Sequence, residues 1–167
     1  MVLQENDMSK KIDRALTVLS RGGMVVITDD EDRENEGDLV MAAGFATEKA
    51  INFMIRKGGG LICVPVEEKR ARELGLVPMY ETNHDPHGTA FTVSVDSVNT
   101  TTGISAADRA RTIRALAAQT STARDFRIPG HLFPLVARPG GTLQRRGHTE
   151  ASLDLVTWFH SGREFRR

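Results

Sequence analysis

The chain has 167 residues, of which 40% are hydrophobic, 26% charged and 5% aromatic, and its 22 acidic and 22 basic side chains give a formal net charge of zero. This length allows one domain with a sizeable core but not two ordinary ones, and the composition excludes a disordered chain. No apolar run is long enough to cross a bilayer, and the N-terminal stretch lacks the apolar region of a secretory signal, so we expect a cytoplasmic protein with no membrane partner.

The predicted helices and strands alternate along the chain. The expected helices cover residues 9–21, with Ser9 as N-cap and Gly22 as the stop, then residues 47–57, 67–74 and 105–118, and a last helix that Thr149 caps. The expected strands cover residues 24–28, 39–43, 61–66, 90–95 and 131–137, and residues 80–88 and 120–130 are expected to be loops. Pro65 favours an edge or end position for the third strand. This order predicts an α+β fold, a single domain with a mixed β-sheet flanked by helices.

The zero net charge hides an asymmetry along the chain. Residues 1–100 carry 17 acidic and 11 basic side chains, whereas residues 101–167 carry 5 acidic side chains and 11 basic ones, all of them arginine. Because arginine forms bidentate hydrogen bonds with phosphate and carboxylate, the second part favours recognition of an oxyanion. A nucleic-acid-binding protein would carry a net positive charge and a basic stripe with interleaved aromatic residues, so no nucleic-acid partner is expected.

Seven of the ten residues from Asp29 to Asp38, DDEDRENEGD, are acidic. The strands predicted on both sides fix the ends of this run. An EF-hand calcium loop that starts at Asp32 is excluded, because Ala43 would occupy the position that needs a bidentate glutamate. Two interpretations remain: a solvated acidic loop, and a pocket of carboxylates that binds a hard divalent cation and transfers protons. Arg33 would then pair with a carboxylate or hold a substrate oxygen.

A metal ion bound by so few carboxylates needs another ligand, and the sequence offers five histidines: His84, His87, His131, His148 and His160. The first two lie in a polar loop and are expected to be exposed. His131 begins a predicted strand, where its side chain can point into a cleft. His148 follows Arg145 and Arg146 at a predicted helix start, an arrangement typical of a phosphate site, although a simple capped helix start explains it equally well.

Four separated motifs carry a family resemblance: DDEDRENEGDL from Asp29, TTGISAADR from Thr101, PGHLFPL from Pro129 and RRGHTEASLDL from Arg145. In this order and spacing they resemble the 3,4-dihydroxy-2-butanone 4-phosphate synthases of riboflavin biosynthesis, over about residues 8–156. The resemblance implies a homodimer with that family's fold and active sites near the dimer interface. It also implies that D-ribulose 5-phosphate is converted to formate and L-3,4-dihydroxy-2-butanone 4-phosphate with Mg²⁺ or Mn²⁺. No organic cofactor is expected, and no GxGxxG or GxxxxGK[ST] motif indicates a nucleotide.

The resemblance also implies roles for individual residues. Glu34 and His148 are expected to bind the metal ion, and Arg33, Glu34 and Asp38 to contact the sugar, with Asp38 or Glu36 as proton acceptor. The segment expected to hold the substrate and its phosphate comprises Arg145, Arg146, Gly147, His148 and Thr149.

The resemblance also concerns two positions outside these motif roles, His131 and Cys63. His131 is expected to be essential for activity. Cys63 borders the family's site, although we interpret it as a small buried apolar residue.

In the implied reaction a base removes a proton from C1 of the sugar to give an enediol. Loss of water, a skeletal rearrangement and excision of C4 as formate follow, and carboxylates with mutually shifted pKa values can supply the proton transfers.

The C-terminal sequence VTWFHSGREFRR departs from the family pattern, in which a further strand and helix carry an acidic residue expected to be needed for catalysis. That role is not transferred to Glu164. We therefore expect residues 1–156 to form a C-terminally incomplete synthase-like domain, residues 157–167 to be a tail outside the family, and activity to be weak or absent. Two alternatives are a catalytically impaired homologue that binds a sugar phosphate or metal ion, and a dimer partner of a full-length synthase.

Overall fold

The computed structural model describes residues 3–161 of the chain, and the side chains of residues 8–158. Glu164 and most of the C-terminal tail lie outside the described residues. The helices are α1 (Leu3–Ser20), α2 (Glu48–Phe53), α3 (Glu68–Glu73), α4 (Ala106–Ala117) and α5 (His148–Ser161), with a π-turn over Met54–Gly58 and single 3₁₀ turns over Ala43–Phe45, Ala123–Asp125 and Gly141–Leu143. No described helix is apolar over a length that could cross a membrane.

The first helix extends further toward the N-terminus than its sequence pattern indicates. α1 begins at Leu3, so the predicted N-cap at Ser9 is wrong. The preceding residues include Leu, Gln and Glu, which are good helix formers, and they continue the helix through that position. The predicted stop is confirmed: Gly22 has φ +74°, and its N–H donates to the Leu19 carbonyl (3.0 Å).

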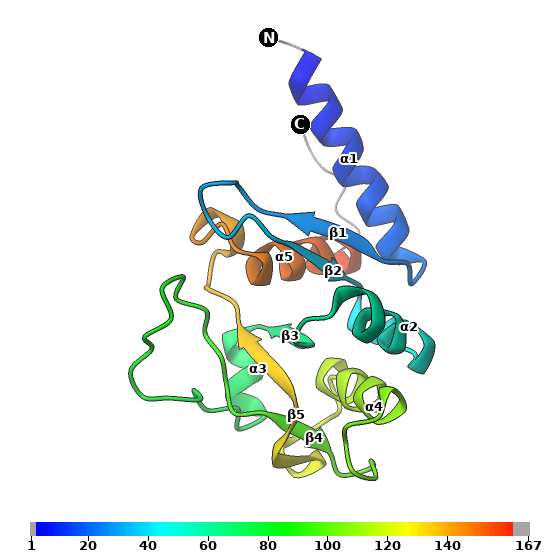
Figure 1. Cartoon of the computed structure of the whole chain (residues 1–167), viewed down its shortest axis with the longest axis vertical. Coiled ribbons are helices and arrows are strands. Elements are labelled where there is room, and N and C mark those ends of the chain that lie inside the picture. Colours follow the sequence, from blue (N-terminus) through cyan, green and yellow to red (C-terminus); the bar gives the residue numbers. More distant parts are fainter. Residues whose placement is uncertain (1–2, 162–167) are drawn as a thin grey trace.

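The acidic run forms the loop of a β-hairpin. β1 (Val25–Thr28) and β2 (Gly37–Val40) are antiparallel, and Thr28 is the partner of Gly37. β2 thus begins two residues earlier than the predicted start at Leu39, because pairing with β1 continues to the end of the acidic run. α1 and α5 lie beside this hairpin (Figure 1).

The second sheet contains β3 (Cys63–Val66), β4 (Val95–Ser97) and β5 (Phe126–Val136) in the order β3-β5-β4. It is mixed, as predicted, since β5 is parallel to β3 and antiparallel to β4. The edge position expected from Pro65 is confirmed.

Two predicted boundaries in this sheet are wrong. β5 begins at Phe126 within the predicted loop, because Phe126 and Arg127 pair with Ser97 and Asp96 of β4, residues remote in the sequence. The strand expected over residues 90–95 is reduced to β4 and isolated bridges, one of which joins Phe91 to Leu135.

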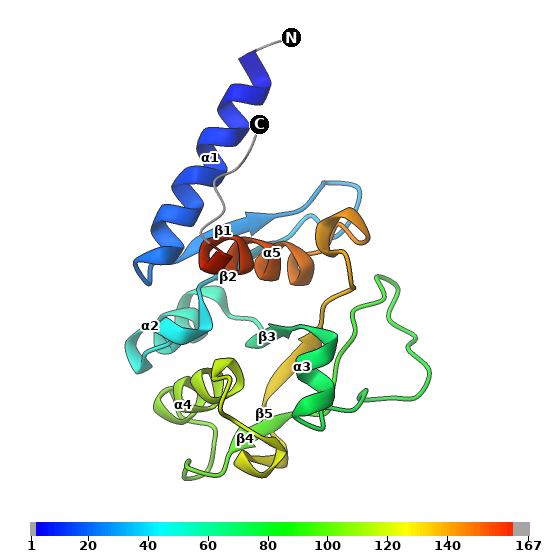
Figure 2. The same ribbon diagram turned by 180° about the vertical axis from the view of Figure 1, so that it is seen from behind.

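Helices surround the second sheet and enclose the core (Figures 1 and 2). α2 packs against α4, and α4 packs against β4. The N-cap predicted at Ser105 is confirmed, since its side chain accepts a hydrogen bond from the Asp108 N–H. The most deeply buried core side chains include Ile51, Leu74, Val95, Leu116 and Leu132. This arrangement confirms the α+β fold class.

Candidate functional site

The Asp29 carboxylate folds the acidic loop back on itself. Its two oxygens accept hydrogen bonds from the backbone N–H groups of Glu34 (3.1 Å) and Glu36 (3.0 Å), and Arg33 Nη1 lies 2.6 Å from Oδ2. Arg33 also pairs with the Glu34 carboxylate at 2.6 Å. The Asp29 side chain is only 6% exposed, so the start of the run is a built structure rather than a solvated loop.

These contacts determine the protonation state of Asp29. Desolvation by burial acts to raise the pKa of its carboxyl group. The Glu36 N–H, the Arg33 guanidinium and the Glu34 N–H outweigh that effect and lower the pKa from 3.8 to about 2. Asp29 is therefore a carboxylate at neutral pH.

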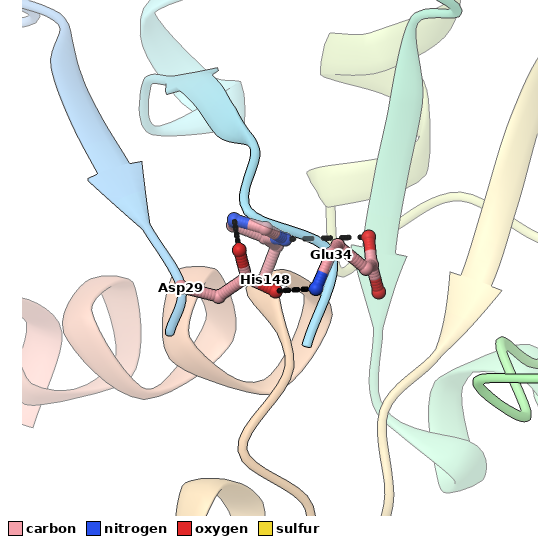
Figure 3. Close-up of side chains that lie close together, drawn as sticks. All are labelled: Asp29, Glu34 and His148. Carbon is pink, nitrogen blue, oxygen red and sulfur yellow. Dashed lines mark hydrogen bonds and ion pairs between the residues drawn. The ribbon is translucent and has the colours of Figure 1, made fainter. Parts of the chain in front are cut away.

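His148 completes a cluster with Asp29 and Glu34, which Figure 3 shows pointing toward one another. Its Nδ1 lies 3.8 Å from Glu34 Oε2, and its Nε2 lies 3.9 Å from Asp29 Oδ1. One ligand atom from each residue falls within 4.8 Å of the others. These separations are too long for hydrogen bonds but suit donors arranged around a common ion.

The buried Nε2 of His148 has no hydrogen-bond partner among the described residues. A buried polar atom without a partner lowers the stability of the fold unless a bound group, such as a metal ion, interacts with it. Carboxylate oxygens with an imidazole nitrogen form a donor set that suits a divalent cation, so the residues present fit such a group. The structure thus brings together both predicted ligands, Glu34 and His148. Asp29 was missed as a member; its position directly after β1 is the signal that could have identified it.

The segment predicted to hold phosphate divides into two parts. Arg145 is engaged: Nη1 pairs with Glu150 Oε2 (2.7 Å), and its other nitrogens donate to the His87 carbonyl (3.1 and 3.2 Å) and the Thr89 hydroxyl (3.2 Å). Arg146 is exposed, and no hydrogen bond or ion pair joins it to any residue that the structure describes. Of these two arginines, Arg146 is therefore the one whose guanidinium can reach a ligand.

The residues after these arginines form the start of α5. Gly147 leaves room for Arg145, because a Cβ at this position would overlap the guanidinium. Thr149 is buried in the first turn of α5. The predicted cap at Thr149 is wrong, because the helix already begins at His148.

A cavity of about 270 Å³ lies beside the cluster, lined mostly by apolar side chains and also by Asp38, Cys63, His148 and Thr149. The Glu36 side chain is exposed and does not line it. Burial, together with the nearby Asp38 charge, raises the pKa of the Cys63 thiol to about 11. Cys63 is therefore a protonated thiol at neutral pH, but it is half-buried in the cavity wall rather than the fully buried residue that we expected from the sequence.

His131 does not join this cluster. It lies on β5 in the second sheet, where its Nδ1 is 2.7 Å from Asp96 Oδ2, and it does not line the cavity. The exposure predicted for His84 and His87 is confirmed. His160 falls among the residues whose side chains are not described.

The sequence model of the family described as 3,4-dihydroxy-2-butanone 4-phosphate synthase matches residues 13–161. The chain belongs to this family. The synthase of Oceanobacillus iheyensis is 55% identical over 151 residues, which are 90% of this chain and 72% of that protein. The riboflavin biosynthesis protein RibBA of Bacillus cereus is 53% identical over 149 residues, 89% of this chain but only 38% of RibBA.

Solved structures of the synthase family agree with the fold. A 3,4-dihydroxy-2-butanone 4-phosphate synthase in complex with two magnesium ions superposes with a TM-score of 0.87 at 47% identity, covering 89% of this chain and 70% of that one. A cation-free synthase gives a TM-score of 0.82 at 45% identity, covering 89% of this chain and 69% of that one. The resemblance read from the four motifs is therefore confirmed, and with it the membership in a family of lyases of riboflavin biosynthesis.

Proposed function

We propose that the chain converts D-ribulose 5-phosphate to formate and L-3,4-dihydroxy-2-butanone 4-phosphate, as a homodimer, with Mg²⁺ or Mn²⁺. The observation that carries the proposal is the buried His148 imidazole beside a cavity: its unpaired Nε2 faces Asp29, and its Nδ1 faces Glu34. The magnesium ions named for the solved relative support this choice of cation.

Glu34 and His148 would hold the cation, and Asp29 lies within reach of the same position. A divalent cation held there would polarise a carbonyl oxygen of the sugar and stabilise the negative charge that develops on it. Arg33, paired with both Asp29 and Glu34, holds the two carboxylates in a fixed orientation. Its role is thus to hold the ligands as well as to face the sugar.

Asp38 is the better candidate for the first proton acceptor. Its side chain lines the cavity next to His148, whereas that of Glu36 does not. The Asp38 carboxylate takes the proton from C1, the electrons of the C–H bond form the C1–C2 double bond, and the π electrons of the C2 carbonyl move onto its oxygen to give an enediolate. Glu36 and His131 remain candidates for the later proton transfers.

Arg146 and the start of α5 would bind the phosphate group. The Arg146 guanidinium has no partner among the described residues, and the N–H groups of His148 and Thr149, in the first turn of α5, have no earlier turn to pair with. Arg145 contributes by holding this segment in place through Glu150.

The test is formate release from D-ribulose 5-phosphate by the purified chain, with and without Mg²⁺. Glu34→Gln keeps the shape of the side chain but removes its charge, and we expect it to lower the rate by about 10²-fold or more. His84→Gln, at an exposed loop position, is the matched control and should leave the rate unchanged.

Each outcome of this test is distinct. Cation-dependent formate that disappears in Glu34→Gln supports the synthase. Saturable binding of the sugar phosphate by folded protein without formate release would instead favour the binding homologue. Sedimentation equilibrium measures the proposed dimer separately.

A further inference from the structure

A second group of polar side chains lies on β4 and β5, apart from the cluster of Asp29, Glu34 and His148. Val95 pairs with Leu132, but the next residue, Asp96, pairs with Arg127. Residues 128–131 of β5 therefore have no partner on β4, and β5 bulges at this point. Bulges of this kind redirect side chains near active sites.

The Asp96 carboxylate spans the bulge and binds one residue with both of its oxygens. Oδ1 accepts the backbone N–H of His131 (3.0 Å), and Oδ2 lies 2.7 Å from His131 Nδ1. The first contact holds the backbone of His131 within the stretch of β5 that has no partner on β4. The second contact fixes the imidazole ring, so that backbone and side chain of His131 are held by the same group.

Asp96 has no freedom to leave this position. Its side chain is 6% exposed, whereas that of His131 is 41% exposed. Gly103, at φ +88°, lies against the carboxylate so closely that a Cβ there would overlap it. Since a buried carboxylate is costly without hydrogen-bond donors, the ring of His131 is held inward on its Nδ1 side and open to solvent on the other.

We propose that Asp96 is a positioning residue that holds His131 as the Nδ1–H tautomer, so that the Nε2 lone pair is presented for proton transfer. A carboxylate hydrogen-bonded to one ring nitrogen sets which nitrogen carries the proton. When Nε2 takes up a proton, the same carboxylate stabilises the imidazolium that forms. The inference rests on the proposed function, in which His131 takes part in the proton transfers.

The test is Asp96→Asn, which preserves the shape of the side chain. The amide oxygen can still accept the His131 N–H, but the NH₂ group now donates to Nδ1 and moves the ring proton to Nε2. We expect kcat for formate release to fall by about 10²- to 10⁴-fold while KM stays within about threefold. ¹⁵N NMR of the His131 ring should show Nδ1–H in the parent chain and Nε2–H in the variant.

Further variants test whether Asp96 and His131 act together and control for the loss of one charge. His131→Gln should lose a similar factor, and the double variant should lose little more, because the two residues act as one unit. Asp13→Asn, at an exposed position of α1, is the control for loss of one acidic charge. A folded Asp96→Asn with kcat within about threefold of the parent would overturn the inference. If the parent chain releases no formate, the proposed function fails, but the inference about Asp96 and His131 is still decided by the NMR spectrum of the parent. A proton on Nε2 of His131 overturns that inference, and a proton on Nδ1 supports it.

Discussion

Asp108 holds the loop that leads into α4 and that carries Gly103, the neighbour of Asp96. Its buried carboxylate accepts hydrogen bonds from the Thr101 hydroxyl (2.6 Å) and the Gly103 N–H (3.2 Å). The Thr101 hydroxyl, with the backbone N–H groups of this loop, outweighs the effect of burial and lowers the pKa of Asp108 from 3.8 to about 2. The ionised form of one residue thus orders the loop against Asp96.

The lowered pKa of Asp108 predicts a pH dependence of stability. Because the folded-state pKa is below the unfolded value, the contribution of Asp108 is fully present above about pH 4 and is lost as the pH falls toward 2. Asp108→Asn should therefore lower the midpoint of urea denaturation at pH 7, and its difference from the parent chain should shrink across that window. Asp13→Asn should follow the parent at every pH. A difference that is constant down to pH 2 would contradict this explanation.

At the scale of elements, the start of α5 is tied to the loop that precedes β4. Arg145 is paired with Glu150 of α5, which is 1% exposed, and donates to the backbone of His87 in that loop. Sequence motifs placed Arg145 and Arg146 together in a phosphate site, and only the folded chain separates their roles. The loop carbonyl that Arg145 binds is 58 residues away in the sequence, beyond the reach of local patterns.

Substitution of the two arginines separates these roles. Arg145→Met leaves the Glu150 carboxylate buried without its partner, so we expect a loss of about 3–5 kcal/mol in the free energy of unfolding. Arg146→Met removes an exposed side chain and should change that free energy by less than about 0.5 kcal/mol, while raising KM for the sugar phosphate. Urea denaturation and steady-state kinetics measure both. Equal losses of unfolding free energy in the two variants would contradict the assignment of a structural role to Arg145 and a ligand-binding role to Arg146.

Local patterns predicted the elements whose causes are local. The apolar run before Asp29 became β1, Gly22 ended α1, and Ser105 capped α4. The start of β5 could not be predicted, because it depends on pairing with Asp96 and Ser97 of a distant strand. The same holds at the site: motif resemblance identified Glu34 and His148, but the contribution of Asp29 follows from the fold of the hairpin loop around its carboxylate.

At the scale of the whole molecule, α5 connects two parts that have separate sheets. It contacts α1 and β1 on the side of the hairpin, and β3 in the second sheet (Figure 1). Asp29 and Glu34 belong to the hairpin loop, while His148 is the first residue of α5. The candidate cation site therefore lies where the hairpin meets the rest of the fold, and the unfolded chain does not assemble it.

A cation that binds this site should stabilise the entire fold. Mg²⁺ or Mn²⁺ at about 100 times its Kd would add about 2.7 kcal/mol, because it binds the native chain in preference to the unfolded one. For a chain of this size that corresponds to a rise in Tm of roughly 5–10 °C. His148→Gln should abolish the rise by removing a ligand, whereas His84→Gln, in an exposed loop, should keep it. Calorimetry with and without the cation decides the matter: an equal rise in Tm for His148→Gln and the parent chain would place the cation elsewhere.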